Sequence, residues 1–591
     1  MITFFTEEGD PVNLAIFRIV FFSTILGMYV SGPSVLWFSS LPRQLLIAPV
    51  GMGWLLPLLP INQTAASVAS ALFIVCCCTG LIGLCSRTSS LLVVLLGFFV
   101  LGIPQFYGKV DHFHHFLWFA GILAASRAGD ALSIDAGIAA WKQAKGGLLY
   151  ALRPARVYAL PLRFVWLLMG IIYLFPGLWK VWHCGFAWAL SDNIKFQMYT
   201  KWLETSGWSP LFRLDHFPIL YKLGGLLTIG FEISFIFLVL FKKLRPVAAI
   251  LGFGFHEATD LFMGISFIGL FVFYLTFIDW ASLFQFLGRK LFREPMYVLY
   301  DGNCTICKTT IGAVKAFDIF GRIVYLNVLD RDALGRHNLG WLDEAALMTD
   351  MHAVVKTRVF RGFASYRALA ARIPLLWLVL PFLWVWPVPR VGGMIYRRVA
   401  DHRSCEFPPP SPRGPENAHS MVPVVAVGTM LIAINVWFGV RGLISGWPFA
   451  CYPTFSWIQG PEQTTLEIAG VTAAGATVPL GLADATVRFT PVKFWWLVRQ
   501  ILWWSKDEQQ RASRLGAFWQ VLVRMDPSYG NFKTVRFYEA TLSTVPEEWA
   551  RNPVRRSLIY EMHVRPAADR PEVTSVSPSY GAGTLNERRA P

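Results

Sequence analysis

Runs of about 20 residues with almost no charged side chain recur along the chain, and a helix of this length spans the hydrocarbon core of a bilayer. Backbone polar groups find no water inside that core, so only helices and closed barrels are stable there. Hydrophobic residues form 54% of the 591 residues and charged residues only 15%, as expected for a chain largely embedded in lipid. We therefore expect a multi-pass α-helical membrane protein.

The apolar runs predict eight spans within residues 1–290 and a ninth further along the chain. They lie near 11–31, 64–84, 88–105, 114–126, 158–182, 217–241, 246–264, 266–287 and 421–441. The fourth run is short for a transmembrane helix.

Basic residues collect in three loops, which the positive-inside rule places in the cytoplasm. The clusters are Arg127, Lys142, Lys145, Arg153 and Arg156; Lys242, Lys243 and Arg245; and Arg289, Lys290 and Arg293. Eight spans with an inside N-terminus satisfy all three clusters. The protein is then expected in a bacterial inner (plasma) membrane, and its net charge of +16 is explained by orientation and anionic lipid rather than by nucleic acid. The lipid bilayer is the expected partner, and no nucleic-acid partner is predicted.

This topology divides the remainder of the chain. Residues 294–407 are predicted to form a cytoplasmic α/β domain, and the proline-rich stretch within 408–420 is predicted to form a stiff linker. The ninth span, 421–441, leads to a small extracytoplasmic α+β domain at 445–591. Its expected strands are Thr464–Ala469, Thr534–Leu542 and Leu558–Val564. The segment Lys493–Trp504 has enough aromatic surface to lie at the bilayer interface.

The tetrapeptide Cys304-Thr305-Ile306-Cys307 follows a β-rich run, Met296–Tyr300, and a turn, and it opens a helical pattern. A cysteine at a helix N-terminus faces unpaired N–H groups and the positive end of the helix dipole, which favour the thiolate. A partner three residues on lies within one turn, close enough to form or resolve a disulfide. This arrangement is typical of a thioredoxin-like redox helix.

Cys304 is the predicted nucleophile, because it is nearer the helix start and such a cysteine is usually the more exposed one. Cys307 would then resolve the mixed disulfide formed with a protein thiol partner. Asp301 could accept a proton or cap the helix. A zinc set with His402 and Cys405 is an alternative, but the long separation argues against it, and no metal is predicted.

Residues from about 296 to 405 resemble the thiol-disulfide oxidoreductase DCC family, named for its Asp-x-x-Cys-x-x-Cys motif. Asp301, Cys304 and Cys307 form that motif here, and VYLNVLD, VVKTRVFRGFASYRAL and YRRVADHR extend the likeness. The resemblance implies a thioredoxin-like fold and thiol–disulfide exchange. One departure is that no proline precedes the expected strand His352–Lys356, where thioredoxin-like folds usually place a cis-proline.

Polar groups inside the predicted spans form a second set of candidates, because a charged side chain there is costly unless it is paired or faces an aqueous cavity. They are Arg18, Asp111, His112, His114, His115, Lys180, Glu232, His256, Glu257 and Asp260. The predicted orientation brings His114, Lys180, His256 and Asp260 towards the outer face. A desolvated Lys180 could lose its proton and act as a base. The same groups could instead join helices or anchor them at the interface, and Arg18 could simply pair with Glu232.

Residues 8–290 resemble the HTTM family, bacterial membrane domains related to vitamin K-dependent γ-glutamyl carboxylase. The likeness rests on NLAIFRIVF, HHFLWFAGIL, YLFPGLWKVWHCG and FHEATDLFMGISFIGLF. In the carboxylase, the lysine of a Tyr-x-x-x-Gly-x-x-Lys stretch deprotonates reduced vitamin K, and a histidine of a His-x-aromatic-Leu stretch assists. The matching residues here are Tyr173, Gly177 and Lys180, and His114, Phe116 and Leu117. The resemblance therefore implies Lys180 as base with His114 assisting.

Other parts of the resemblance are less complete. His256 matches a family histidine without an assigned role, and Pro176 and Trp179 are not what the carboxylase carries. The propeptide-binding region has no clear counterpart. Trp179, with Trp182 and Phe186, is expected to wall a pocket that suits the flat ring of a quinone or quinol, with Trp179 and His256 as cofactor-binding residues.

Three functions stay open on the sequence. The first is a membrane-bound thiol-disulfide oxidoreductase that couples a cytoplasmic dithiol to a membrane domain able to bind a quinone or another lipid. The second is a carboxylase-like lyase that uses Lys180 at an outward-facing site. The third is a lipid-binding or transport module in which the charges within the spans line a path.

Overall fold

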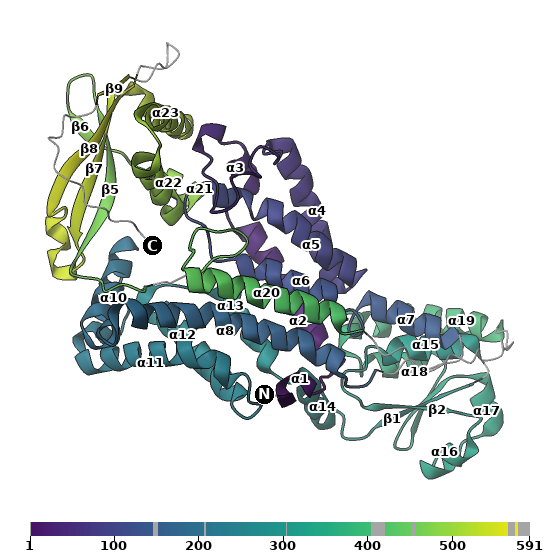
Figure 1. Cartoon of the computed structure of the whole chain (residues 1–591). Coiled ribbons are helices and arrows are strands. Elements are labelled where there is room, and N and C mark those ends of the chain that lie inside the picture. The colour runs from purple at the N-terminus through teal and green to yellow at the C-terminus, as the bar shows by residue number, and fades with distance from the viewer. Residues whose placement is uncertain are drawn as a thin grey trace.

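A computed structural model of the chain describes residues 2–145, 152–205, 208–302, 304–402, 420–451, 455–564 and 574–576. A body of aligned helices occupies its centre, with an α/β domain at one end and a sheet flanked by helices at the other (Figure 1). The predicted linker falls largely in 403–419, outside the described residues, as does Cys405.

The helical body is formed by the first half of the chain and by one later helix. Its elements are α1 (Ile2–Thr6), α2 (Pro11–Ser31), α3 (Val35–Ser39), η1 (Arg43–Leu45), α4 (Gln63–Ile82), α5 (Ser86–Val100), η2 (Ile103–Phe106), α6 (His114–Ala125), α7 (Ile134–Lys145), α8 (Arg156–Cys184), α9 (Ala187–Leu190), α10 (Asn193–Glu204), η3 (Leu214–His216), α11 (Pro218–Leu238), α12 (Arg245–Met263), α13 (Ile268–Phe271), η4 (Val272–Phe277), α14 (Trp280–Leu291) and α20 (Val422–Arg441).

Six helical segments of the described chain are long and apolar enough to cross a membrane, which is compatible with an integral membrane protein. They are α2, α4, α5 continued through η2, α8, α11 and α20. The other three predicted spans are helical, but they differ from these six in length, hydropathy or straightness. The run at 114–126 is the 12-residue α6, and α12 does not reach the same hydropathy. The run at 266–287 is broken, because α14 bends by 66° from the segment before it.

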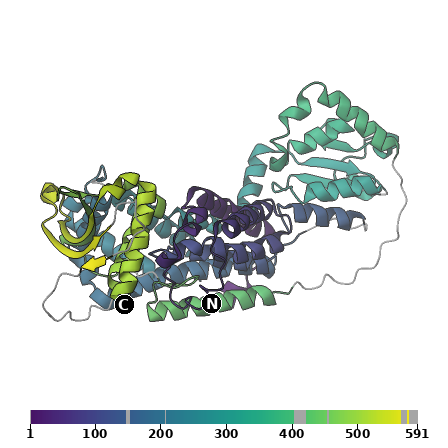
Figure 2. The ribbon, with the colours of Figure 1, turned by 90° about the horizontal axis from the view of Figure 1, so that it is seen from above.

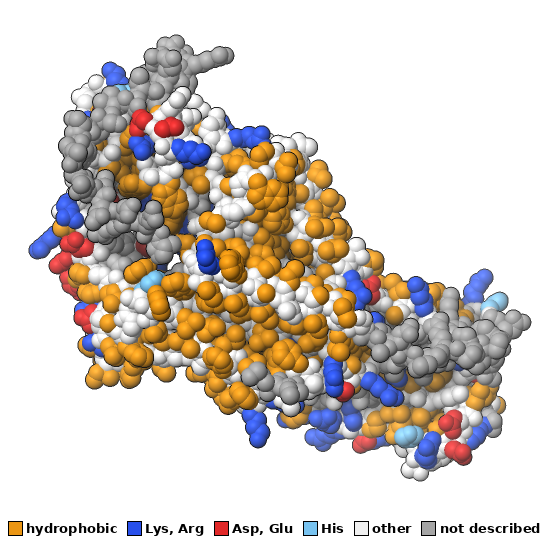
Figure 3. Space-filling model, viewed as in Figure 1, with side chains coloured by type: hydrophobic (Ala, Val, Ile, Leu, Met, Phe, Trp, Pro, Cys, Tyr) orange, Lys and Arg blue, Asp and Glu red, His pale blue; other side chains and the backbone are white. Residues whose placement is uncertain are grey.

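The surface of the helical body is dominated by hydrophobic side chains, whereas charged side chains gather over the two end domains (Figure 3). Leu227 and Ile250, for example, point outward from α11 and α12 with most of their side-chain surface exposed. A soluble protein would bury such residues, whereas lipid accommodates them. The pattern thus agrees with a body surrounded by hydrocarbon.

The α/β domain is built on a four-stranded sheet of order β2-β1-β3-β4. Its elements are β1 (Met296–Tyr300), α15 (Thr305–Lys315), β2 (Ile323–Asn327), α16 (Arg331–Arg336), α17 (Glu344–Thr349), β3 (His352–Val355), β4 (Arg358–Arg361), α18 (Phe363–Ala370), η5 (Pro374–Leu376), η6 (Pro381–Trp384) and α19 (Val388–Asp401). Strands β1 and β2 are parallel, and β3 runs antiparallel to β1 and β4. The β1–α15–β2 unit places α15 on one face of the sheet, above a core that includes Met296 and Ile311. The expected strand His352–Lys356 is confirmed as β3.

The C-terminal domain carries a five-stranded antiparallel sheet of order β6-β5-β7-β8-β9. Its elements are β5 (Glu462–Val471), β6 (Thr477–Pro479), α21 (Ala483–Phe489), α22 (Pro491–Trp504), α23 (Glu508–Met525), η7 (Pro527–Asn531), β7 (Thr534–Ser543), η8 (Pro546–Arg551), β8 (Arg555–His563) and β9 (Thr574–Val576). The three expected strands are present as β5, β7 and β8. The expectation that Lys493–Trp504 lies at the bilayer interface is wrong for its main apolar face, because Phe494, Leu497 and Ile501 are buried within the protein.

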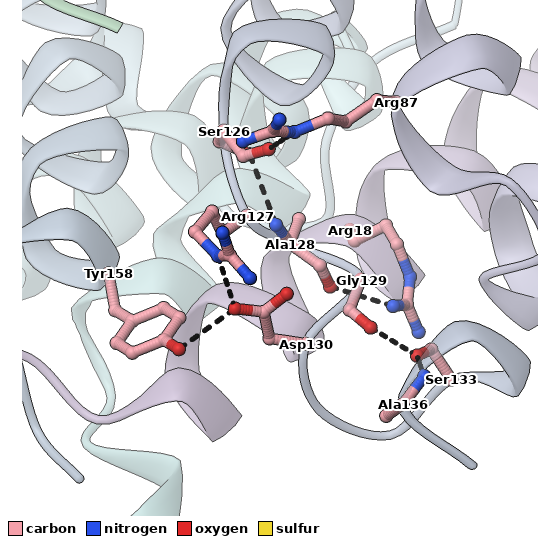
Figure 4. A network of polar contacts seen from close by, with 10 residues as sticks. All are labelled: Arg18, Arg87, Ser126, Arg127, Ala128, Gly129, Asp130, Ser133, Ala136 and Tyr158. Carbon is pink, nitrogen blue, oxygen red and sulfur yellow. Dashed lines mark hydrogen bonds and ion pairs between the residues drawn. The ribbon is translucent and has the colours of Figure 1, made fainter. Parts of the chain in front are cut away.

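A loop between α6 and α7 is fastened to the helical body by a buried arginine (Figure 4). Arg18 of α2 is fully buried, and it donates to the carbonyl oxygens of Ala128 (2.7 Å), Leu132 (2.6 Å) and Ala131 (3.3 Å). Glu232 is not its partner, so the expected Arg18–Glu232 pair is wrong. The three carbonyls accept from the two terminal nitrogens of the guanidinium and fix the loop that leads into α7, whereas Nε of Arg18 is buried without a hydrogen-bond partner in the described part of the chain.

Further bonds hold the two ends of this loop. Tyr158 donates to Asp130 (2.9 Å), and Arg87 donates to the Ser126 carbonyl (2.8 Å), as Figure 4 shows. At the start of α7, Asp135 accepts bonds from the backbone N–H groups of Cys85 (2.8 Å) and Ser86 (2.7 Å) at the N-terminus of α5. Helix α7 is therefore a rigid extension of the helical body, and it packs along α15 of the α/β domain.

Replacing Arg18 by Met should lower the free energy of unfolding by about 2–4 kcal/mol, because the carbonyls of the loop lose their donors. The thermal midpoint of the purified protein in detergent measures this loss. Arg289→Met, a change at an exposed arginine of α14, is the control and should leave the midpoint unchanged. Equal midpoints for the two variants would contradict the anchoring role of Arg18.

Candidate functional site

The two motif cysteines occupy the start of α15. Cys304 is the N-cap residue, and its sulfur accepts the backbone N–H of Cys307 at 3.4 Å. Both cysteines are free thiols rather than a disulfide. A sulfur that accepts a helix N-terminal N–H is stabilised as a thiolate, so the geometry supports Cys304 as the nucleophile.

The exposure of these cysteines differs from the sequence expectation. Cys304 is 0% exposed and Cys307 6%, so the expectation that Cys304 is the accessible thiol is wrong in this arrangement. The sulfurs join the core that β1 and α15 form, and α7 packs along the same helix. An ideal Cβ on Gly137 of α7 would lie 3.6 Å from the ring of Phe317, just past the end of α15. Exchange with a protein disulfide requires approach in line with the sulfur, so the domain must open before it reacts.

The other residues of the motif region are placed as follows. Asp301 is buried at the end of β1, and the N-cap position of α15 is occupied by Cys304. Met351 stands before β3, at the place where thioredoxin-like folds usually carry a cis-proline. No cluster of three metal-ligating side chains occurs among the described residues, and the suggested zinc ligand Cys405 lies beyond them.

A cavity of about 380 Å³ lies in the helical body, towards the C-terminal domain. Its lining combines aromatic and apolar groups with polar side chains from several helices. The polar residues are Lys109, Asp111, His112, His114, His115, Tyr173, Glu232, His256, Ser266 and Thr490. The structure thus brings together seven of the ten polar residues that the sequence singled out within spans, once Lys180 is counted as the partner of Glu232.

Lys180 lies behind this lining rather than in it. Its ammonium contacts both oxygens of Glu232, at 2.6 and 2.8 Å, and both side chains are almost completely buried. The indole ring of Trp188 lies 5.1 Å from the same ammonium. A buried pair of this kind satisfies two costly charges at once. A role for Lys180 as a base would require this pair to separate, and Glu232 is the member that faces the cavity.

A chain of three hydrogen-bonding side chains reaches the cavity. Tyr274 donates to the hydroxyl of Tyr173 (2.9 Å), which lies 2.7 Å from Nε2 of His256. Because the Tyr173 oxygen accepts from Tyr274, its own proton is directed to Nε2, which leaves the ring proton on Nδ1. The Nδ1 atom of His256 is buried without a partner in the described part of the chain. This nitrogen thus belongs to a residue that lines the cavity and is left without a protein partner there.

Several predicted wall residues lie elsewhere. Trp179 donates to the Gly439 carbonyl of α20 (3.0 Å) and does not line the cavity, so the structure does not bring it together with His256. Trp182 and Phe186 are exposed on the outside of the body. Glu257 and Asp260 are exposed on α12. Trp179 and Trp182 are turned away because only one face of α8 meets the cavity.

The C-terminal domain closes the cavity, a contribution that the sequence did not reveal. Thr490 and Val492 join its lining, and the next residue, Lys493, is fully buried. The Lys493 ammonium contacts Asp111 (2.9 Å) and donates to the Lys109 carbonyl (2.7 Å). Burial lowers the pKa of Lys493, and the carboxylate of Asp111 opposes this shift. The sequence feature that could have indicated this contact is the position of the lysine, which is alone on the apolar face of a tryptophan-rich helix.

The dithiol lies within the α/β domain, whereas the cavity is lined by the helical body and by Thr490 and Val492 of the C-terminal domain. These two domains lie at opposite ends of the helical body (Figure 1). A molecule bound in the cavity therefore does not touch the sulfurs in this structure.

Comparison with known proteins bears on one of the two sites. No curated protein and no solved structure matches the chain. Residues 298–406 match the family of DCC1-like thiol-disulfide oxidoreductases, and this match includes both Cys304 and Cys307.

Proposed function

We propose that the protein is a membrane-bound thiol-disulfide oxidoreductase whose α/β domain is thioredoxin-like and faces the cytoplasm. The observation that carries the proposal is the sulfur of Cys304 at the N-terminus of α15, where it accepts the N–H of Cys307 inside the segment that matches the oxidoreductase family. The sheet order β2-β1-β3-β4, with β1 and β2 parallel, supports a thioredoxin-like domain.

The reaction follows from the two thiols. The Cys304 thiolate attacks a substrate disulfide, breaks its S–S bond, and releases one substrate thiolate. The Cys307 thiolate then attacks the Cys304 sulfur and releases the second substrate thiolate. The substrate gains two electrons, and the protein is left with a Cys304–Cys307 disulfide. A second dithiol reverses these steps and regenerates the reduced protein.

Helix α7 controls access to the thiols in this proposal. The α/β domain is docked on α7, the sulfurs are buried, and α7 is itself fixed to the body through Arg18 and Asp135. The domain reacts when α15 separates from α7, so the docked form is the resting form of the dithiol.

The helical body supplies a second candidate function, the binding of a quinone or another flat, apolar ring. The cavity volume lies in the range of small-molecule sites, and the unpartnered Nδ1 of His256 offers one directed donor among aromatic walls. The resemblance of residues 8–290 to HTTM domains also supports the binding of a quinone. A carboxylase-like reaction with Lys180 as base, assisted by His114, is the extension of this candidate, and it needs the Lys180–Glu232 pair to open.

Substituting Cys307 by Ser should trap a mixed disulfide through Cys304, because the resolving thiol is absent. The variant is incubated with a disulfide-containing protein substrate or cell extract, and the adducts are detected by non-reducing electrophoresis and located by mass spectrometry. Cys304→Ser is the matched control and should trap nothing. Adducts of equal yield from both variants, or from neither, would rule out the assigned roles.

Substituting His256 by Phe should weaken the binding of a water-soluble naphthoquinone about tenfold, because a hydrogen bond of roughly 1.4 kcal/mol is lost. Isothermal calorimetry on the purified full-length protein measures the affinity. His183→Phe is the control, because His183 stacks on Trp457, 3.9 Å away, and does not line the cavity. Unchanged affinity in His256→Phe, or no binding by the unaltered protein, would remove the quinone candidate.

A further inference from the structure

Part of the α/β domain exposes large apolar side chains that do not contribute to the core of the domain. Between Pro374 and Val399, the elements η5, η6 and α19 contain no buried residue. Large apolar side chains point outward instead, with Leu378 83%, Phe382 67% and Trp386 70% exposed. Soluble domains rarely leave so many large apolar groups together on their surface, and such a patch marks an interaction site. We call residues 374–399 the apolar ridge.

The chemistry of the apolar ridge is specific. It contains the tryptophans Trp377, Trp384 and Trp386, all exposed, and α19 adds three exposed arginines, Arg390, Arg397 and Arg398. Tryptophan and arginine beside aliphatic side chains are the composition of segments that lie in the headgroup layer of a bilayer. A protein partner of acidic character would match the arginines but not the run of leucine, phenylalanine and valine.

The position of the apolar ridge relative to the helical body agrees with this composition. Arg372, just before the ridge, lies over the ring of Phe292 (4.7 Å) and donates to the carbonyl of Glu294 (2.9 Å), immediately after α14. Within the ridge, Trp377 contacts Phe320, which in turn contacts Phe292. The ridge thus begins where α14 leaves the helical body.

Helix α14 has the same character as the ridge. It bends by 66° from the preceding segment and exposes Phe286 and Leu291 beside the basic Lys290. The α/β domain stands to one side of the helical body rather than in line with it (Figure 2). Further along the sequence, the first described helix after the domain is α20, a candidate span that begins at Val422. Candidate membrane segments therefore flank the domain on both sides in the chain.

We propose that the apolar ridge lies in the interfacial layer of the bilayer, with its tryptophans among the lipid carbonyls and its arginines on anionic headgroups. The α/β domain then has a lipid contact of its own in addition to α14 and α20. This contact is independent of the dithiol chemistry and of any ligand in the cavity. Its test is therefore separate from the tests of the proposed function.

The test uses the full-length protein in vesicles of phosphatidylethanolamine and phosphatidylglycerol. A photo-reactive benzoylphenylalanine is placed at Leu378 or Phe382, and at Trp341 as the matched control. Trp341 is also an exposed aromatic position of the α/β domain, but it lies between α16 and α17, away from the ridge. After illumination, lipid adducts are counted by mass spectrometry.

The proposal predicts lipid adducts at positions 378 and 382 that exceed those at 341 several-fold and that decrease when phosphatidylglycerol is replaced by phosphatidylcholine. Cross-links from 378 and 382 to a second copy of the chain would overturn it in favour of a dimer interface. Lipid adducts no more frequent at 378 and 382 than at 341 would overturn it as well. A variant carrying Leu378→Glu and Phe382→Glu should abolish lipid adducts from a probe at Leu375.

Discussion

The packing of α7 along α15 is the interaction on which the arrangement of the functional parts depends. Helix α7 belongs to the helical body, because Arg18, buried in α2, holds the loop before it and Asp135 ties its first turn to α5. Helix α15 belongs to the α/β domain and carries Cys304 at its N-terminus. Small side chains on α7, Ala136 and Ala140, are fully or almost fully buried and allow close approach of the neighbouring elements. The contact therefore fixes the α/β domain, and with it the dithiol, relative to the helical body.

In the helical body, charged side chains lie in an apolar interior and are stabilised there by pairing. Lys180 and Glu232 pair across α8 and α11, and Lys493 enters from the C-terminal domain to meet Asp111. Each pair removes the cost of an isolated buried charge, and each lies beside the same cavity. The Lys493 pair also explains why the C-terminal domain sits against the body: its lysine completes the polar cluster at the mouth of the cavity. The unpartnered Nδ1 of His256 is the polar atom in this cluster that the protein itself leaves available.

Local features were predictable from the sequence, and features that depend on packing between distant segments were not. The strand, turn and helix around Cys304 follow from short-range patterns, so the position of this cysteine at a helix N-terminus was expected and found. Its burial was not expected, because Cys304 joins a core with side chains from later elements of the domain, such as Met351 and Leu369, which short-range patterns do not place. Seven of the ten polar residues singled out in the spans lie at or beside the cavity, but the suggested pair of Arg18 with Glu232 is absent, since Arg18 donates to backbone carbonyls and Lys180 pairs with Glu232. Trp179 was misplaced because a one-residue step along α8 turns a side chain by about 100°.

The central claim is that docking on α7 keeps the dithiol in a buried, resting form, and the rate of alkylation of Cys304 tests it most directly. The measurement uses a background in which the exposed Cys78 and Cys85 are replaced by Ser. Gly137→Leu should clash with Phe317 and separate α15 from α7, whereas Gly137→Ala fits, because its Cβ meets that ring at ordinary contact distance. The account predicts faster alkylation of Cys304 in Gly137→Leu than in Gly137→Ala, with the same thermal midpoint for the helical body. Equal alkylation rates in the two variants, or a rapid rate already in the unaltered protein, would contradict it.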